Sequence, residues 1–350
     1  MKVSLVVVCH HSSEVMSECV SSFRRVGGEA SVQTEVVAVE QSDDQGEQRA
    51  VAAMDVDRMV VRPNAGYAAG LNAGMEEATG ETLLLANPDI RFAGGSLGPL
   101  LDALGGGYDV VGPQFVWDAA GEILFPPAED PAPSAELRRT IRSRWQWQWQ
   151  SGLAASLEEL WRVWSAGGPV AVPNLRGPLL AVPRAAVDAF GPFDEGYFLY
   201  YEETEWLWRA RRAGARFGLV GNSRVVHHWG HSTARREDRG EVEARSRERF
   251  FIRNYPAVWR WFLRRMAVSR SEAGVSGEEI SRFEELPEKA ADVWLISSFP
   301  HLVPSVGCVK RSRLPDGLSD ITGTGRWFAL AASRGEGGWS PVGSWAWGRS

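Results

Sequence analysis

Continuous aliphatic runs alternate with amphipathic segments along the first part of the chain. Residues 3–8 form a run of aliphatic side chains interrupted only by Ser4, as expected of a strand buried on both faces of a parallel sheet. Further strand-like runs occur at 34–44, 59–61 and 83–87, and a small-residue-rich segment at 67–78 is predicted to be helical. This β-α-β-α-β-α-β series predicts an α/β fold with a mostly parallel, doubly wound central sheet that carries helices on both faces.

The pattern changes twice further along the chain. Residues 126–168 form an insert that is rich first in Pro and Ala and then in Arg and Trp, and residues 169–270 return to regular strands and helices. Residues 271–350 read as short aromatic or aliphatic strands between Gly/Pro turns, which predicts a small β module. We therefore predict one large domain over residues 1–270, with its first half at 1–115, followed by that module.

Composition narrows the class of protein. The chain has 350 residues, 44% of them apolar and 23% charged, as in ordinary globular proteins. Its net charge of -6 argues against a nucleic-acid partner. The three cysteines are scattered and form neither a disulfide framework nor a zinc motif, so we expect a reducing compartment, the cytoplasm. No apolar run is long enough to span a membrane.

The stretch LLLANPDIRF at residues 83–92 places a carboxylate directly after a buried strand. Burying Asp89 there is costly unless another group pairs with it. Pro88 fixes its own φ and holds Asn87 extended, so the chain leaves the strand along a defined path. Open α/β sheets bind ligands at the carboxyl ends of their strands, which favours a metal or phosphate site, although Asn-Pro-Asp is also a common turn sequence.

Other polar side chains stand at the ends of predicted strands or at a helix start: Glu40, Glu202, Glu203, Glu205, His227, His228 and His231. Each type has an ordinary structural explanation, because first-turn glutamates favour the helix dipole and a histidine pair can pack at a strand end. The first βα turn lacks the glycines of a dinucleotide-binding turn, which argues against a nicotinamide or flavin enzyme. The order of these residues along the chain is therefore the informative feature.

In that order, the chain resembles the family 2 glycosyltransferases of the GT-A fold, and in particular their bacterial rhamnosyltransferase-like branch. The resemblance covers roughly residues 3–266. It rests on five segments, VSLVVVCHHS, VVAVEQSDD, RPNAGYAAGLNAGMEEATGETLLLANPDIRF, FDEGYFLYYEETEWLWRARRAG and VVHHWGHS. None is decisive alone, and all five in order are quite specific.

The resemblance implies how a nucleotide-sugar donor binds. Glu40 matches the acidic residue that faces the nucleotide's pyrimidine, where a carboxylate can accept the N3–H of uracil or thymine. Asn64, Asn72 and Asn87 fall in the segments that the family places around the donor. Asp89 matches the family's Asp-x-Asp variant and would hold Mg²⁺ or Mn²⁺ against the pyrophosphate.

The resemblance also implies a mechanism. Glu203 matches the family's catalytic carboxylate, with Glu202 beside it, and would take the proton from the acceptor hydroxyl in an inverting displacement. His227 matches a family histidine near the metal, and His228 is an equally reachable neighbour. Glu203 and Glu205 are each one methylene longer than the usual aspartates, and Cys9-His10-His11 replaces the usual Asn-Tyr.

The leading interpretation is an inverting transferase that moves a sugar, with rhamnose as the first choice, from a UDP- or dTDP-sugar to a glycan or lipid-linked acceptor. A sugar-nucleotide pyrophosphorylase is the enzymatic alternative, although its Gly-rich N-terminal loop is absent after residue 8. A catalytically degenerate, glycan-binding or scaffold protein is the alternative from another class.

The segment after Pro256 leaves the question of a membrane open. It predicts a helix with Trp259, Phe262, Leu263 and Met266 on one face and arginines elsewhere. Such a helix can lie on an anionic membrane, at the inner face of the plasma membrane, or can simply pack on the core.

Overall fold

The computed structural model describes residues 1–142, 146–227, 239–266, 277–298, 302, 305–312, 314–315 and 326–348. The chain divides into two compact units. The first unit comprises Met1–Phe115, Pro127–Pro131 and Gly167–Tyr255. The second unit comprises Val116–Pro126, Ala132–Ala166 and Pro256–Ser350.

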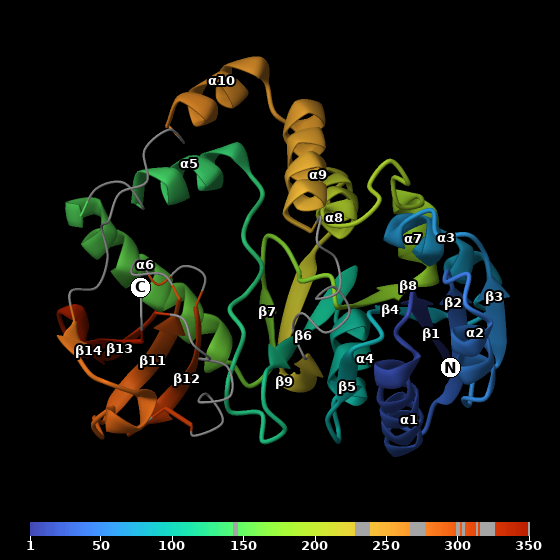
Figure 1. Cartoon of the computed structure of the whole chain (residues 1–350), viewed down its shortest axis with the longest axis horizontal. Helices are drawn as coiled ribbons and strands as arrows, with labels where there is room; N and C mark the ends of the chain where they lie inside the picture. Colours follow the sequence, from blue (N-terminus) through green and yellow to red (C-terminus); the bar gives the residue numbers. More distant parts are fainter. Residues whose placement is uncertain are drawn as a thin grey trace. The chain divides into compact units, whose positions relative to one another are not determined.

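A large sheet forms the centre of the first unit (Figure 1). Its strands are β1 (Lys2–Cys9), β2 (Gln33–Glu40), β3 (Arg58–Val61), β4 (Thr82–Ala86), β5 (Ile90–Phe92), β6 (Val110–Val116), β7 (Pro169–Ala171), β8 (Leu179–Pro183) and β9 (Phe217–His227). The strand order is β3-β2-β1-β4-β8-β6-β9-β5, and β7 also pairs with β9. The first four of these strands are mutually parallel, as the sequence predicts. Beyond β4 the sheet continues through antiparallel pairs of β8 with β4 and β6, and of β9 with β5 and β7.

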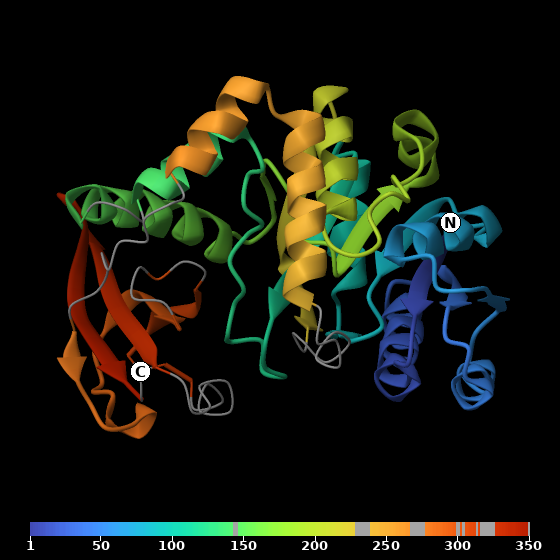
Figure 2. The ribbon, with the colours of Figure 1, turned by 45° about the horizontal axis from the view of Figure 1, so that its top comes forward.

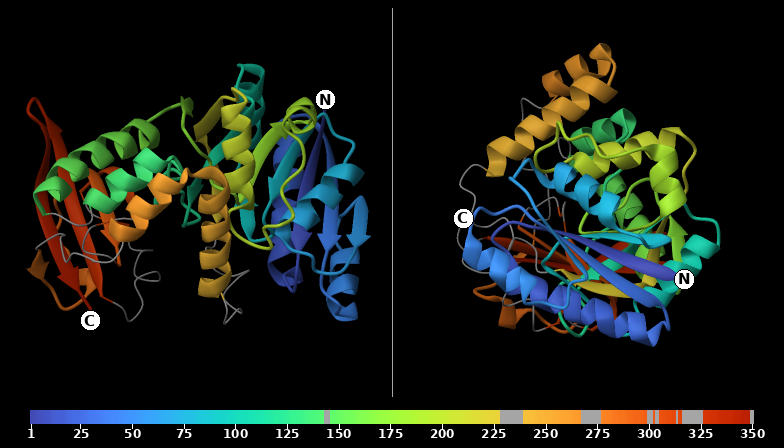
Figure 3. Two further views of the ribbon diagram at one scale, coloured as in Figure 1. Left: turned by 90° about the horizontal axis from the view of Figure 1, so that it is seen from above. Right: turned by 90° about the vertical axis from the view of Figure 1, so that its right-hand side faces the viewer.

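Helices flank this sheet on both faces (Figure 3). They are α1 (Ser13–Glu29), α2 (Gln45–Ala52), α3 (Tyr67–Glu77), α4 (Leu97–Gly105), α7 (Arg184–Phe190), α8 (Glu202–Arg212) and α9 (Arg239–Asn254). The expected α/β class is confirmed.

The side chains of β1 show why most of its sequence is apolar. Val6 and Val8 lie against Gly74 and Gly70 of α3, at positions where an added Cβ would approach the valine methyl groups to 2.3 and 2.5 Å. Cys9 points to the other face, where its thiol contacts Met16 of α1. Because both faces of β1 are covered, an alternating polar pattern would bury unpaired polar groups.

The second unit is built on a smaller sheet with the order β10-β14-β13-β11-β12 (Figure 2). Its strands are β10 (Glu278–Glu279), β11 (Ala291–Ser297), β12 (Val306–Arg311), β13 (Trp327–Gly335) and β14 (Gly338–Trp347), with a single 3-10 turn at Phe283–Glu285 among the described residues. The unit also contains α5 (Pro133–Arg142), α6 (Gln146–Trp164) and α10 (Ala257–Met266).

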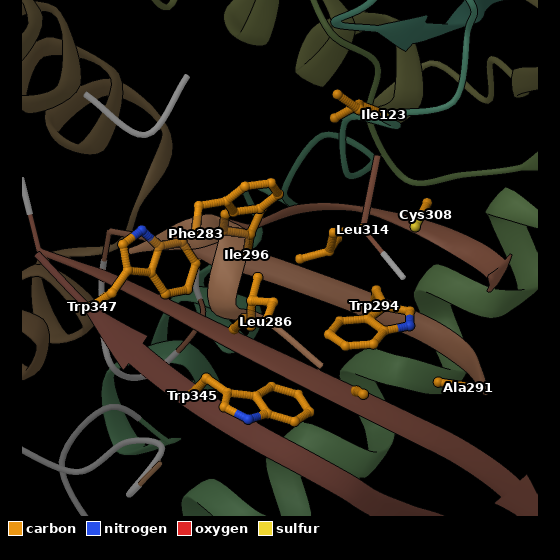
Figure 4. Close-up of a cluster of buried hydrophobic side chains, with 12 residues drawn as sticks. Ile123, Phe283, Leu286, Ala291, Trp294, Ile296, Cys308, Leu314, Trp345 and Trp347 are labelled. Atoms are coloured by element: carbon orange, nitrogen blue, oxygen red, sulfur yellow. The ribbon is translucent and has the colours of Figure 1, made fainter. Parts of the chain in front are cut away.

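Tryptophans dominate the interior of this second unit (Figure 4). Trp294 and Trp345 stack with ring centroids 5.3 Å apart, and Trp347 packs beside Phe283. These rings are buried, so the aromatic richness of the C-terminal sequence is explained by a hydrophobic core.

The insert and the C-terminal strands share this unit. Leu124, which precedes the insert, exchanges two backbone hydrogen bonds, of 2.7 and 3.1 Å, with Gly307 of β12. Trp164 at the end of α6 donates its indole N–H to the carbonyl of Phe125 over 3.0 Å. The residues of 126–168 that form α5 and α6 thus belong with residues from the far end of the chain.

None of the described helices combines the length with the apolar content needed to cross a bilayer.

Candidate active site

Three parallel strands of the first unit end at one edge of the sheet. Cys9 at the end of β1 is in register with Glu40 at the end of β2, and Val7 is in register with Ala86 of β4. Glu40 and the Asn87-Pro88-Asp89 turn therefore leave the sheet at the same edge, where ligands bind in folds of this class (Figure 1).

Glu40 presents a half-satisfied carboxylate at this edge. It is fully buried, and its Oε1 accepts hydrogen bonds from the backbone N–H of Ser42, over 2.6 Å, and from the Ser42 hydroxyl. Among the described residues its Oε2 has no hydrogen-bond partner. Buried acceptors are rarely left unpaired, so Oε2 is suited to receive a donor from a ligand.

Asp89 and His227 are brought together by strands far apart in the sequence. Ile90, directly after Asp89, pairs with His227 in the antiparallel β5–β9 ladder. Asp89 Oδ1 lies 3.6 Å from His227 Nε2, and the Asp89 side chain is fully buried. The His227 ring also packs on Phe115, with centroids 5.8 Å apart. His228, the other histidine predicted for the metal, lies outside the described residues.

The pair of Asp89 and His227 fits a cation that shares its ligands with a substrate. Across the ranges that the structure describes, no cluster of three or more His, Cys, Asp or Glu side chains could hold a metal alone. A carboxylate oxygen and an imidazole nitrogen at this separation leave other coordination positions to phosphate oxygens and water, which Mg²⁺ and Mn²⁺ accept readily.

The acidic cluster at the start of α8 separates into distinct roles. Glu205 is buried and paired, because Arg209 donates to both of its oxygens over 2.8 and 3.0 Å. Glu202 is also buried, and burial, reinforced by the adjacent charge of Glu203, raises its pKa well above the ordinary value of a glutamate. Glu202 is therefore harder to ionise than an ordinary glutamate.

Glu203 is half-buried and more accessible than its neighbour. Burial raises its pKa, while hydrogen bonds from the helix's first turn, the Thr204 hydroxyl and the charge of Arg176 oppose that rise. Its side chain lies over Gly177, where an added Cβ would come within 2.8 Å of Glu203 Cγ and 3.1 Å of Cδ. The missing side chain at residue 177 thus makes room for the longer glutamate.

Sequence reasoning missed two residues of this site. Arg176 approaches the base from the loop before β8, and burial lowers its pKa to about 10, against the opposing charges of Glu129 and Glu203. The arginine therefore remains charged at neutral pH. Its position beside a glycine in NLRGPLL gave no distinctive signal.

Tyr67 is the second missed residue. It begins α3, and its hydroxyl is buried with no hydrogen-bond partner among the described residues. Burial raises the pKa of Tyr67 well above its usual value, and the charges of Glu202 and Glu203, and then of Asp89, add to the rise. The charges of the acidic pair and of Asp89 thus both affect the pKa of Tyr67.

The three asparagines predicted to contact the donor differ in their surroundings. Asn64 accepts a hydrogen bond from the N–H of Gly66 over 3.1 Å, and Asn87 is half-buried at the end of β4. The amide of Asn72 is engaged with the loop before α8, since it bonds the N–H and the carbonyl of Phe193 over 2.9 and 3.0 Å. Asn72 therefore fixes this loop to α3.

Tight backbone packing joins the start of α3 to the segment before α8. Tyr67 N–H donates to the carbonyl of Phe198 over 2.8 Å. Tyr200 and Tyr201 both have φ near 67°, a left-handed conformation that is costly for residues with side chains. Strain held directly before Glu202 is typical of functional sites, and it sets the direction in which α8 starts.

Gly66 is the position most sensitive to an added methyl group in this packing. Its φ is 102°, and a Cβ would approach the Phe198 backbone to 2.5 Å. We expect Gly66→Ala to lower the free energy of unfolding by about 1–3 kcal/mol in denaturant titrations. Gly28→Ala, at a helical site with nothing within 4 Å of the new Cβ, should be neutral or stabilising. Equal stabilities of the two variants would contradict this account.

Comparisons with known proteins agree with this geometry. Residues 4–157 match the family model of glycosyl transferase family 2. The chain is 29% identical over 239 residues to the N-acetylglucosaminyl-diphospho-decaprenol L-rhamnosyltransferase of Mycobacterium tuberculosis. This alignment covers 59% of this chain and 72% of the relative. It is 24% identical over 256 residues to the low-salt glycan biosynthesis hexosyltransferase Agl10 of Haloferax volcanii, covering 72% of this chain and 75% of the relative.

Among solved structures, the mannosyltransferase PcManGT of Pyrobaculum calidifontis, in complex with GDP-Man and Mn²⁺, is similar with a TM-score of 0.48 and 16% identity. That similarity covers 77% of this chain and 70% of the mannosyltransferase. The match of residues 4–157 to that family model and the names of the two curated relatives indicate that the protein is a glycosyltransferase.

Proposed function

We propose that this glycosyltransferase moves a hexose, with L-rhamnose as the first candidate, from a UDP- or dTDP-linked donor to a hydroxyl of a saccharide acceptor, with inversion. The observation that carries the proposal is the buried Asp89 carboxylate facing His227 Nε2 across 3.6 Å, in a unit that also holds the half-buried carboxylate of Glu203. A base and a cation-binding carboxylate around one space are what direct displacement at an anomeric carbon requires.

Glu203 is the general base of this mechanism. Burial raises the pKa of Glu202 further than that of Glu203, so Glu203 is the member of the pair that ionises more readily and can accept a proton. Arg176 and Thr204 favour its ionised form and hold the carboxylate in place. As the acceptor oxygen attacks from the face opposite the leaving diphosphate, its proton passes to Glu203, and the new glycosidic bond has the inverted configuration.

Asp89 and His227 would hold the divalent cation, Mg²⁺ or Mn²⁺, that the mechanism needs. The bound cation supplies positive charge to offset the charge that develops on the leaving diphosphate. The support from this chain is the buried Asp89 carboxylate facing His227 Nε2 across 3.6 Å.

We propose a lipid-linked saccharide as the acceptor. The rhamnosyltransferase relative is named for an N-acetylglucosaminyl-diphospho-decaprenol substrate. An acceptor of that class keeps its lipid in a bilayer and offers only its sugar to the enzyme, so the enzyme would work at a membrane surface. The donor assignment can be tested by screening the purified protein for metal-dependent release of nucleoside diphosphate from several nucleotide sugars. Release from none of them would contradict the assignment.

Pyrimidine selectivity should depend on Glu40. Its unpaired Oε2 can accept the N3–H of uracil or thymine, whereas cytosine presents an acceptor at N3. We expect UDP and dTDP to bind roughly tenfold to a hundredfold better than CDP, the value of one charge-assisted hydrogen bond. Glu40→Gln should narrow this gap in calorimetry, because the amide keeps the Ser42 bonds through its oxygen and loses the charged acceptor.

Glu76→Gln on the exposed side of α3 is the matched control and should leave the selectivity unchanged. Equal affinity of the parent protein for UDP, dTDP, CDP and GDP would rule out the assignment of Glu40.

A further inference from the structure

The second unit carries a face of α10 that is apolar and exposed. Val258, Trp261 and Phe262 are 69%, 61% and 39% exposed, although large apolar side chains are normally buried. They lie at i, i+3 and i+4, so they share one face of the helix, and Arg265 at i+7 extends it with its guanidinium 5.7 Å from the Trp261 ring centre.

This exposed face differs from the apolar face that the sequence predicts. Trp259, expected on the same stripe as Phe262, is half-buried, while Val258 and Trp261 face solvent. The helix is thus apolar on more than one side. Packing within the protein explains why Trp259 is half-buried. It does not explain why the side chains of Val258 and Trp261 are apolar and exposed.

A second helix adds charge to the surface. α5 packs directly against α10 within the second unit (Figure 1). By sequence the two helices contain six arginines and a single acidic residue, Glu136, and the side chains of Arg138 and Arg265 are exposed. This concentration stands out in a chain whose net charge is -6.

We propose that the α5–α10 helix pair is a docking surface for an anionic lipid bilayer. Apolar side chains that project between arginines match a headgroup layer in both respects, because the rings enter the acyl boundary while the guanidiniums meet lipid phosphates. A protein partner would be expected to bury such rings under a covering surface of its own, whereas a bilayer accepts a shallow, curved apolar face. The inference rests on the proposed lipid-linked acceptor, and it extends that proposal by naming the surface that brings the enzyme to it.

Vesicle binding tests the proposal with the full chain. Sedimentation with phosphatidylcholine vesicles should recover little protein, and vesicles with about a third phosphatidylglycerol should recover most of it, in a salt-sensitive manner. The double variant Trp261→Ser and Phe262→Ser should weaken binding to the anionic vesicles by roughly tenfold or more. Arg138→Glu on α5 should weaken binding to anionic vesicles by roughly fivefold or more and leave phosphatidylcholine binding unchanged.

Val342→Ser is the matched control, since Val342 is an exposed apolar side chain of the same unit on β14, and it should bind like the parent protein. Parent-like vesicle binding by the double variant overturns the proposal. The proposal is also overturned if sedimentation equilibrium shows that the parent protein is a dimer and the double variant a monomer. The exposed face would then bind a second copy of the chain.

The outcome for this surface can be separated from the outcome for the proposed function. Metal-dependent binding of UDP or dTDP, and release of nucleoside diphosphate without lipid, should be the same in the double variant as in the parent. If vesicle binding fails while these activities persist, the docking surface is wrong and the proposed function stands. If vesicle binding behaves as expected and no nucleotide sugar is used, the proposed function is wrong.

Discussion

Glu203→Gln is expected to lower kcat by about 10²–10⁴-fold, the usual contribution of general acid–base catalysis. The amide keeps the size of the carboxyl group and its contact with Gly177 but cannot accept the acceptor's proton. The affinity for nucleoside diphosphate and metal should be nearly unchanged, because Glu203 acts on the acceptor side of the reaction. Steady-state kinetics together with calorimetry would separate the two effects.

The pH dependence of the parent enzyme offers an independent check. A base must be ionised to act, and burial raises the pKa of Glu203. Activity should therefore be full above this raised pKa and fall as the pH drops through it, at a higher pH than an ordinary glutamate would give. Arg176→Met removes a charge that favours the ionised form, so the acidic limb of kcat/KM should move to still higher pH.

Neighbouring substitutions decide whether the base is assigned to the right residue. Glu202→Gln should cause a smaller loss, because the raised pKa of Glu202 makes it the less readily ionised carboxyl of the pair, and glutamine preserves its size and its hydrogen-bonding capacity. Glu205→Gln breaks the pair with Arg209 and should affect stability more than chemistry. Normal turnover in Glu203→Gln, with loss in either neighbour, would show that the base is the neighbour. Glu203→Asp tests whether the extra methylene of the glutamate matters. An active aspartate variant would indicate that the glutamate only shifts the position of the base. An inactive one would indicate that the rest of the site is adapted to the longer side chain.

The parallel half of the fold could be predicted because its signals are local. The apolar run at residues 3–8 corresponds to β1, and the predicted helix at 67–78 corresponds to α3. The short strand β5 was not predicted, because IRF has too few residues to show a period. It is defined by its pairing with β9, more than a hundred residues later, and such distant pairing leaves no local trace.

The grouping of the insert with the C-terminal strands was beyond sequence reasoning for the same reason. Leu124 and Gly307 exchange hydrogen bonds across a large separation in the chain, and neither residue marks a boundary in composition. The pattern of apolar and polar residues shows which segments must pack against another element. It does not show which element that is.

The candidate site shows the same division. Glu40 and Asp89 could be singled out as candidates because an acidic residue at the end of a buried run is unusual and needs an explanation, whereas Glu203 was singled out by the family resemblance. Arg176 and Tyr67 lie in ordinary surroundings, and only the fold brings them to the acidic pair. Asn72 was predicted as a donor contact, and its amide is engaged with Phe193 in this structure, which makes it a residue that positions the loop before α8.

Asp89→Ala is expected to abolish transfer and to remove the metal dependence of nucleotide binding. Asp89 carries the buried carboxylate that follows β4 at the edge of the sheet. Its Oδ1 lies 3.6 Å from His227 Nε2. Without it, His227 alone cannot hold Mg²⁺ or Mn²⁺, which prefer oxygen ligands. Calorimetry should show that Mn²⁺ strengthens UDP binding to the parent and leaves the variant's weaker, Glu40-dependent binding unchanged.

Controls separate this result from simple unfolding. Asp102→Ala, at an exposed position of α4, should keep both turnover and metal dependence. Asp89→Asn keeps the volume of the side chain, so its melting temperature should stay close to that of the parent while its metal dependence is lost. His227→Ala should weaken metal affinity less than Asp89→Ala does, because it removes a neutral ligand rather than a charged one. If Asp89→Asn folds and still shows metal-dependent binding and turnover, the cation is held elsewhere, and the strand end at Asp89 is then an ordinary Asn-Pro-Asp turn.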